Sequence, residues 1–298
     1  MTKKSIAIIG AGKIAYSVTS ALVKSGYNIQ CVISRKLSSA ELLANKFSIP
    51  HHANSISKIT VEVDIFFLTV PDGEIKKVAE KLSRLKRDFT KCICIHFSGV
   101  EDIGALESLK KKGCVVGSLH IIRPFPSKNI VDIKNSPASI EAENKQATQF
   151  LIQLSGKLKL KSHMIVSDEK VFHHLAAVHS SNFLVGNLFN AFSLISSKSN
   201  SSKNILRQTT QSALDNVFKL SPAKALSGPI DRGDIYTIKK HIDALDAKIK
   251  SSKNNQFKLL MKNYIIQSLS LLEVVKAKYG KLNKGHLKIE KFLKNQLV

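Results

Sequence analysis

Two polar residues interrupt an apolar helical pattern that begins at Ser167. His179 and Asn182 stand three residues apart, so on a helix they would share one face. A histidine can exchange a proton near neutral pH, and an amide can position a carbonyl or an imine. The pair therefore indicates acid–base chemistry on a bound substrate, although a polar pair held in a core or at a subunit interface would explain the same residues. We assign no chemistry to His173 and His174, which lie in the same pattern.

Three further residues are candidates for the same chemistry. Ser98 and His120 each follow a short apolar stretch of strand length, so both would stand at strand ends. Each could equally be a capping or core residue. Arg232 lies in the segment 226–234, a tight turn whose glycines, proline and final Asp234 are explained by turn and cap geometry. The turn does not require an arginine, so Arg232 could bind an anionic substrate group.

A glycine-rich turn near the start of the chain has the spacing of a nucleotide-binding motif. Gly10 and Gly12 come directly after the apolar stretch 5–9 and open a helical pattern, with the small Ala15 three residues further on. Gly10 would allow a tight turn, and Gly12 would let the backbone approach a pyrophosphate at the positive end of the helix. A chance strand, turn and helix is the alternative. We predict a dinucleotide-binding turn formed by Gly10, Ala11, Gly12, Lys13 and Ile14.

The end of the second predicted strand indicates which dinucleotide binds. A fold that binds NAD usually places an acid there for the ribose hydroxyls, but this chain has Ser34, Arg35 and Lys36. A hydroxyl and two cations would hold a 2′-phosphate that an acid would repel, which favours NADP. The alternative is that these are merely exposed charges. Val70 and Pro71, at the end of a later buried strand, are expected to complete the cofactor site.

Patterns of strand and helix alternate through the first half of the chain and then give way to helices alone. We therefore predict an α/β fold, a Rossmann-type doubly wound parallel sheet over residues 1–164, followed by an all-helical substrate and dimerisation domain over 165–298. The first helix of the second domain would run for about thirty residues and is apolar on nearly every face. Such a helix must be covered, which predicts a homodimer.

Composition excludes several other classes of protein. The chain has 298 residues and a formal charge of +24, but its six arginines and forty lysines are scattered and aromatic residues make up only 6%. This pattern favours a solvated surface over a specific nucleic-acid site. No apolar run approaches the ~18 residues of a membrane span. The four cysteines lack metal-ligand spacing, which predicts buried thiols, no metal site and a cytoplasmic location.

Several segments match a known pattern when they are taken together. They are His96-Phe-Ser-Gly99, Ser118-Leu-His120, Ala-Val-His-Ser-Ser-Asn-Phe-Leu at 177–184 and Leu-Ser-Gly-Pro-Ile-Asp-Arg-Gly-Asp at 226–234. In combination they resemble a family of NADP oxidoreductases that pairs a Rossmann-like domain with a helical domain of unknown function. That family is similar in architecture to pyrroline-5-carboxylate reductase and prephenate dehydrogenase. The resemblance covers roughly residues 4 to 250 and implies the fold and the cofactor, but no substrate.

These observations lead to one main hypothesis. The protein would be an NADP-dependent oxidoreductase that transfers a hydride to or from a small carbonyl or imine substrate, because hydride transfer needs orientation and one proton donor from the protein. The alternative is an NADP-binding sensor or scaffold without turnover. Nucleic-acid binding through bulk charge is a third hypothesis, and it predicts strongly salt-dependent affinity.

Overall fold

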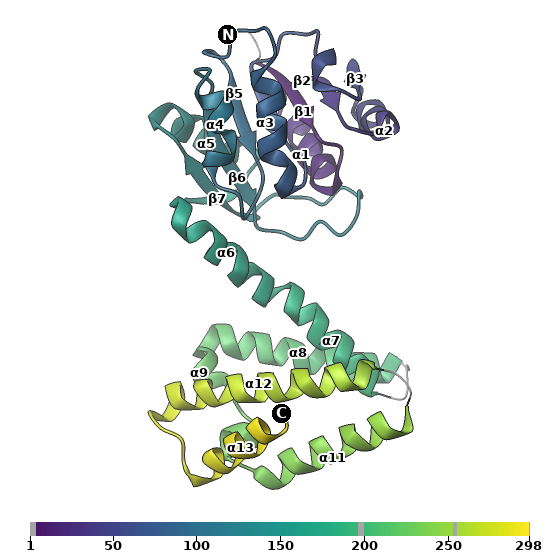
Figure 1. Ribbon diagram of the computed structural model, residues 1–298, viewed down its shortest axis with the longest axis vertical. Helices are drawn as coiled ribbons and strands as arrows, with labels where there is room; N and C mark the ends of the chain where they lie inside the picture. The colour runs from purple at the N-terminus through teal and green to yellow at the C-terminus, as the bar shows by residue number, and fades with distance from the viewer. Residues whose placement is uncertain (1–3, 196–199, 253–254, 298) are drawn as a thin grey trace. The chain divides into compact units, whose positions relative to one another are not determined.

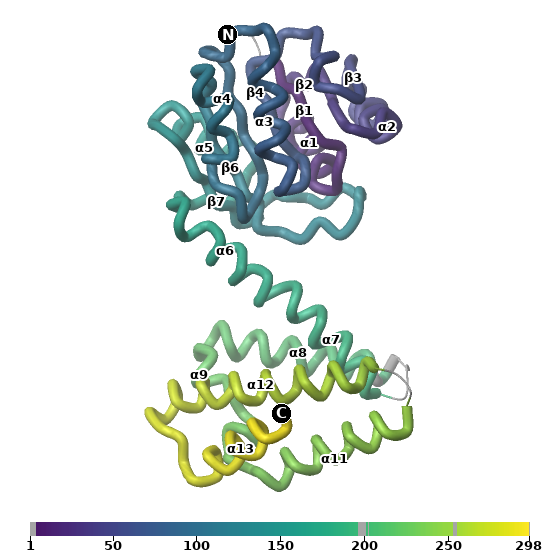
Figure 2. Tube along the Cα trace, in the orientation of Figure 1, coloured from purple at the N-terminus to yellow at the C-terminus, as the bar shows by residue number. Residues whose placement is uncertain are grey.

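The computed structural model describes residues 4–195, 200–252 and 255–297 (Figures 1 and 2). The chain forms two compact units, Met1–Leu184 and Val185–Val298, each with its own core. The helix that follows the sheet belongs to the first of these compact units. The domain boundary expected at residue 164 stays a prediction. Among the helices in the described ranges, none is both long enough and apolar enough to cross a bilayer.

The first unit is built on one sheet of eight strands in the order β3-β2-β1-β4-β5-β6-β7-β8. All neighbouring strands run parallel except β6 and β7, which are antiparallel. The order reverses between β1 and β4, which confirms the predicted doubly wound sheet. The strands are β1 Ser5–Ile9, β2 Asn28–Ile33, β3 His51–Ala53, β4 Ile65–Leu68, β5 Ile93–His96, β6 Val115–Ile121, β7 Pro137–Ala142 and β8 Lys161–Met164.

Helices cover both faces of this sheet (Figure 1). In β1, Ile6 and Ile8 pack with α1, α2 and α5, whereas Ala7 and Ile9 pack with α3, because successive side chains of a strand point to opposite faces. All four cysteines are buried and free. The helices are α1 Lys13–Lys24, α2 Leu37–Phe47, α3 Ile75–Ser83, α4 Glu107–Lys110 and α5 Lys145–Lys157, with 3-10 turns η1 Ile56–Lys58, η2 Asp72–Glu74 and η3 Ile103–Leu106.

A long segment, 122–136, joins β6 to the antiparallel β7 (Figure 2). It passes α1, where the N–H of Val131 donates to Ser17 Oγ at 3.0 Å. The first residues of this segment, directly after β6, lie at the same edge of the sheet as the ends of β4 and β5. The segment therefore brings side chains of its own to the edge where ligands bind in such sheets.

The helix predicted over about thirty residues from Ser167 is two helices, α6 Ser167–Ser180 and α7 Asn182–Leu194. Ser181 separates them with φ −123° and ψ −64°, and its hydroxyl donates to the carbonyl oxygen of Ala177 at 2.6 Å. A hydroxyl that bonds back to the preceding turn competes with the regular helix hydrogen bonds. His179 and Asn182 consequently lie on different helices.

All regular elements in the described part of the second unit are helices, which confirms the predicted class of the C-terminal region. Its core joins side chains of α10 to α13, among them Ile230, Ile238, Leu272 and Ile289. The predicted basic tail contains a further helix, α13, which begins at a capping box. The helices after α7 are α8 Asn200–Leu220, α9 Pro222–Ala225, α10 Pro229–Arg232, α11 Ile235–Ser251, α12 Gln256–Tyr279 and α13 Lys284–Asn295.

Candidate functional site

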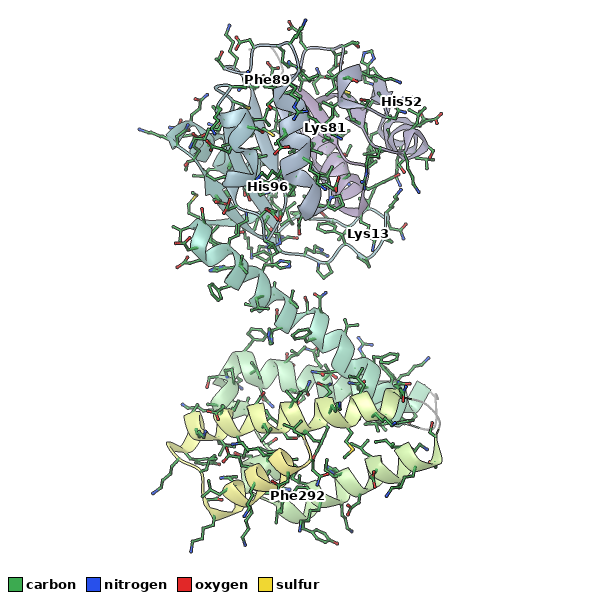
Figure 3. The ribbon with its side chains drawn as sticks, in the orientation of Figure 1. Lys13, His52, Lys81, Phe89, His96 and Phe292 are labelled. Atoms are coloured by element: carbon green, nitrogen blue, oxygen red, sulfur yellow. The ribbon has the colours of Figure 1, made fainter. Side chains whose placement is uncertain are left out.

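A cavity of about 700 Å³ lies at the ends of β1, β2 and β4. It adjoins the point where the strand order reverses, which is where ligands bind in doubly wound sheets. Of the ten residues predicted to bind the cofactor, eight line this cavity: Gly10, Ala11, Gly12, Ser34, Arg35, Lys36, Val70 and Pro71. The other two, Lys13 and Ile14, form the first turn of α1 and are not among the lining residues (Figure 3 labels Lys13).

The glycine turn fits a dinucleotide for two reasons. Gly10 has a φ of +110°, and a Cβ atom there would lie 2.6 Å from the carbonyl carbon of Thr69, so only glycine can hold this position. Gly12 is the N-cap of α1, where no side chain caps the helix and no acid stands in the first turn. The N–H groups at the start of α1 therefore remain available to an anion such as a pyrophosphate.

The cations predicted to select the dinucleotide stand at the rim of this cavity. Arg35 is exposed, and its Nη1 lies 3.5 Å from Glu74 Oε2, which also lines the cavity. Lys77 Nζ approaches the same carboxylate at 3.4 Å. Exposed ion pairs of this kind contribute little to stability, so a ligand phosphate can compete with Glu74 for Arg35.

Next along the sheet, His96 ends β5 as a fully buried side chain. Its Nδ1 accepts from the N–H of Ser98 at 3.2 Å, so the other ring nitrogen carries the proton and donates to the carbonyl oxygen of Asp102. Burial lowers the pKa of His96 to about 3, assisted by the charge of Lys170. The Ser98 hydroxyl accepts from the N–H groups of Val100 and Glu101 and so holds the loop after β5.

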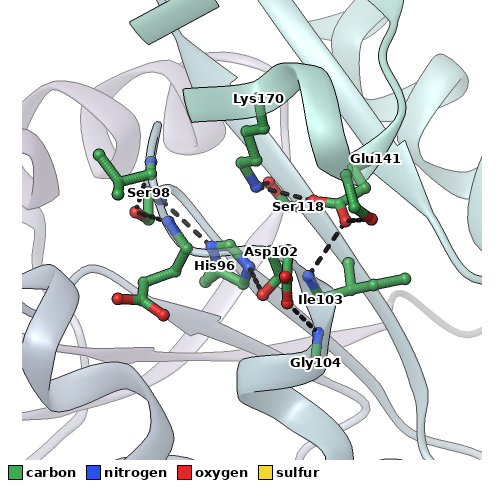
Figure 4. A network of polar contacts seen from close by, with 11 residues as sticks. His96, Ser98, Asp102, Ile103, Gly104, Ser118, Glu141 and Lys170 are labelled. Atoms are coloured by element: carbon green, nitrogen blue, oxygen red, sulfur yellow. Dashed lines mark hydrogen bonds and ion pairs between the residues drawn. The ribbon is translucent and has the colours of Figure 1, made fainter. Parts of the chain in front are cut away.

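A buried ion pair links this loop to α6 (Figure 4). Lys170 Nζ lies 2.8 Å from Glu141 Oε2 and 2.5 Å from Ser118 Oγ, and all three side chains are buried. The other oxygen of Glu141 accepts from Ser167 Oγ at 2.6 Å and from the N–H of Ile103 at 3.2 Å. Burial lowers the pKa of Lys170, and the bond to Glu141 opposes that shift. Sequence reasoning missed both partners, although an acid within the strand pattern 139–141 was an available signal.

Two histidine rings meet over the loop that follows β5. The centroids of His120, on β6, and His174, on α6, are 5.5 Å apart. A Cβ atom on Gly99 would lie 2.6 Å from His174 Nδ1 and 2.7 Å from His120 Nε2, so this close approach requires glycine. Burial lowers the pKa of His120 to about 4, and His174 and Lys170 add to the effect. His174 Nδ1 is buried and has no hydrogen-bond partner among the described residues.

A second cavity, of about 210 Å³, opens beside this histidine pair. Its walls come from β6 and the segment after it and from α6 and the start of α7. They consist of His120, Ile122, Arg123, Pro124, His174, Ala177, Val178, Ser180, Ser181 and Asn182. Two predicted catalytic residues, His120 and Asn182, thus share one cavity, whereas Ser98 does not line it. Sequence reasoning did not find Arg123 or assign a role to His174.

The remaining candidates occupy other positions. His179 is exposed and does not line the second cavity; its ring packs edge-on against Phe183 with centroids 4.7 Å apart. Arg232 belongs to the second unit, where its Nη2 lies 3.9 Å from Asp234 Oδ2. Within the described ranges, no group of three or more acidic, histidine or cysteine side chains is placed to hold a metal ion.

A glycine turn that leads into a helix, a cavity at the switch point and a mostly parallel sheet define the Rossmann-type dinucleotide-binding class. Residues 5–91 match the family described as "NADP oxidoreductase coenzyme F420-dependent", and residues 136–263 match a domain of unknown function, DUF2520. The chain therefore joins an NADP oxidoreductase domain to a DUF2520 domain, which confirms the resemblance drawn from the sequence. A search among curated proteins finds no match.

Solved structures share this fold over nearly the whole chain. An inferred NADP oxidoreductase from Bacteroides fragilis has a TM-score of 0.70 at 22% identity, covering 88% of this chain and 97% of that one. Prephenate dehydrogenase from Aquifex aeolicus, in complex with NAD+, has a TM-score of 0.56 at 13% identity and coverages of 91% and 99%. A pyrroline-5-carboxylate reductase from Coxiella burnetii has a TM-score of 0.53 at 15% identity, with the same coverages. The domain match supports an oxidoreductase that uses a nicotinamide dinucleotide.

Proposed function

We propose that this protein is an NADP-dependent oxidoreductase that transfers a hydride to or from a small carbonyl or imine substrate. The observation that carries the proposal is the 700 Å³ cavity, because its walls join the glycine turn to Ser34, Arg35 and Lys36. A dinucleotide needs both features at once, a helix N-terminus for its pyrophosphate and a group at the second strand for its ribose. The match of residues 5–91 to an NADP oxidoreductase family supports the same function.

Each part of the cavity has a role in this proposal. The N–H groups at the start of α1 would bind the pyrophosphate, which Gly10 and Gly12 allow to approach the backbone. Arg35 and Lys36 would bind the 2′-phosphate, with Arg35 leaving Glu74 to do so. Bound NADPH supplies a hydride, and the product also needs a proton, which a side chain at the same edge of the sheet must give. His120 stands at that edge.

Other features of the proposal follow from the sequence. We propose a substrate and dimerisation role for the helical region 165–298, homodimerisation through its exposed apolar residues, and a cytoplasmic location without specific nucleic-acid binding. An NADP-binding sensor or scaffold without turnover is the alternative. The two differ in one observable, since only an oxidoreductase changes the cofactor absorbance when a substrate is added.

Titration of the purified protein with NADPH and NADH tests the proposal. We expect NADPH to bind at least about tenfold more tightly, which corresponds to about 1.4 kcal/mol. The variant Arg35→Asp should lose most of that difference. Arg207 is an exposed residue of α8 that does not line the cavity. The control variant Arg207→Asp changes the net charge by the same amount and should keep the preference for NADPH. Equal affinities would contradict the choice of NADP, and failure to bind either dinucleotide would contradict the function.

A further inference from the structure

The second cavity is lined by groups that attract an anion. Arg123, His120, His174 and Asn182 have side-chain N–H groups that can donate to it, and the described residues that line it include no carboxylate. Glu141 on β7 is already paired with Lys170, and Asp72, whose charge acts on His120, does not line the cavity. A guanidinium without a carboxylate beside it in the lining favours an anionic ligand, and a carboxylate can accept two parallel bonds from it.

We propose that this cavity is the substrate site and that it selects a small carboxylate, which Arg123 binds while His120 and His174 face the reacting carbonyl or imine. The proposal deepens the proposed function and rests on it for the reaction. A volume of about 210 Å³ equals the liquid volume of roughly seven waters, so the substrate must be small.

Arg123 is held in place for this role. Its backbone N–H donates to the carbonyl oxygen of Ile121 at 2.9 Å, directly after β6, and its Nη1 donates to Ser136 Oγ at 3.4 Å. Ser136 is buried, so this contact anchors the guanidinium from one side. A guanidinium has five N–H donors in a planar fork, and the remaining ones can bind a carboxylate through two parallel bonds.

The histidine pair supplies the second half of the site. His174 Nδ1 is buried without a partner among the described residues, and an unpaired buried polar atom is unfavourable unless a ligand or water satisfies it. His174 stands four residues after Lys170 on α6, so both belong to one face of the helix. The bond from Lys170 to Ser118 on β6 therefore fixes the face of α6 that brings His174 to His120.

Lactate and lactamide, matched in shape but different in charge, test the selectivity. The full chain without cofactor is titrated with each at constant ionic strength, and the histidine ring protons are followed by NMR, with His120→Gln and His174→Gln to assign them. We expect lactate to shift these two residues and to bind at least about tenfold more tightly than lactamide, because hydrogen bonds to charged groups are stronger than neutral ones. Arg123→Gln should abolish this preference, and Arg123→Lys, which keeps the charge without the fork, should reduce it.

The control variant is Lys134→Gln. Lys134 is exposed, belongs to the segment 122–136 as Arg123 does, and does not line the cavity. The variant lowers the net charge as Arg123→Gln does and should leave the preference unchanged. Equal binding of the two probes, no response of His120 and His174, or an unchanged preference in Arg123→Gln would each overturn the inference. NADPH is titrated separately, so loss of cofactor binding with the preference for lactate intact would refute the proposed function alone.

Discussion

Lys170 on α6 and Glu141 on β7 form an ion pair of 2.8 Å in which both side chains are almost completely buried. Glu141 also accepts hydrogen bonds from Ser167 at the start of α6 and from the backbone of Ile103. A pair of this kind adds little net stability, because desolvation offsets the attraction, but removal of one partner leaves a buried charge uncompensated. The pair therefore fixes the position of α6 on the sheet more than it strengthens the fold.

Lys170→Met should destabilise the protein by about 3–5 kcal/mol, since Glu141 would keep its charge without a partner. The double variant Lys170→Met with Glu141→Gln should recover much of this loss. Urea denaturation at pH 7 measures both, with the exposed Lys161→Met on β8 as the control. A double variant as unstable as the single one would show that the lysine matters for packing and not for charge compensation.

Stability should fall as the pH falls below neutrality. Burial lowers the pKa of His96 from 6.5 to about 3, so between these values the unfolded chain binds more protons than the folded one. The contribution of neutral His96 is complete above pH 6.5 and is lost towards pH 3, on the order of a few kcal/mol. Lys170 and His120 favour the neutral form and the carbonyl of Asp102 opposes it.

Urea midpoints measured from pH 7 to pH 4 test this dependence in the wild type and in His96→Gln, whose amide can keep a donor near Asp102. The variant should show a shallower decline, because one of the groups that must stay neutral has gone. His120, with its pKa lowered to about 4, would account for part of the slope that remains. Parallel declines in the two proteins would argue against His96 as a source.

Gly10→Ala should abolish NADPH binding and destabilise the fold, because the new Cβ would lie 2.6 Å from Thr69. Gly26→Ala is a matched control: Gly26 also has a positive φ, +77°, but its Cβ would meet nothing within 4 Å. The control should lose about 1–2 kcal/mol from backbone strain alone and keep its NADPH affinity. Similar affinities in the two variants would show that the clash at the turn does not shape the cofactor site.

Gly99→Ala should displace the rings of His120 and His174, which the added Cβ would approach within 2.7 Å. We expect the lactate response to be lost while the NADPH dissociation constant stays within about threefold, under ~0.7 kcal/mol. Gly156→Ala on α5 places a Cβ in open space and serves as the control. Retention of the lactate response in Gly99→Ala would mean that the histidines do not depend on this close approach.

Once a substrate is found, His120→Gln should lower turnover by about 10²- to 10⁴-fold, the usual loss when a proton donor is removed. His179→Ala provides the comparison, because His179 was the first candidate from the sequence but is exposed and does not line the second cavity. NADPH affinity should be nearly unchanged in both variants. A large loss in His179→Ala alone would return the role of proton donor to His179.

The exposed apolar residues of α7 predict self-association. Val185, Phe189 and Phe192 are spaced to share one face and are 69%, 63% and 46% exposed in the single chain. Light scattering at micromolar concentration should give the mass of a homodimer, and Phe189→Glu should weaken the dimer. A monomeric mass for the unmodified protein would contradict this expectation.

Local patterns in the sequence predicted the sheet and the glycine turn, because a strand, a turn and a helix are encoded by neighbouring residues, and eight of the residues expected around the cofactor line one cavity. The second cavity depends on contacts that neighbours do not encode. Lys170 meets Glu141 and Ser118, which lie 29 and 52 residues earlier in the chain. The thirty-residue pattern from Ser167 reads as apolar on nearly every face, so periodicity could not decide whether His174 or His179 faces the sheet.

The residues that line the two cavities all come from the first 182 positions. Both cavities are therefore lined by one uninterrupted stretch of the chain, and α6 contributes to the second of them as part of the sheet-bearing unit. A chimaera that exchanges everything beyond residue 184 for the corresponding part of a relative would keep every residue that lines these two cavities. In evolution, the sequence beyond residue 184 could thus diverge while all of these lining residues are kept.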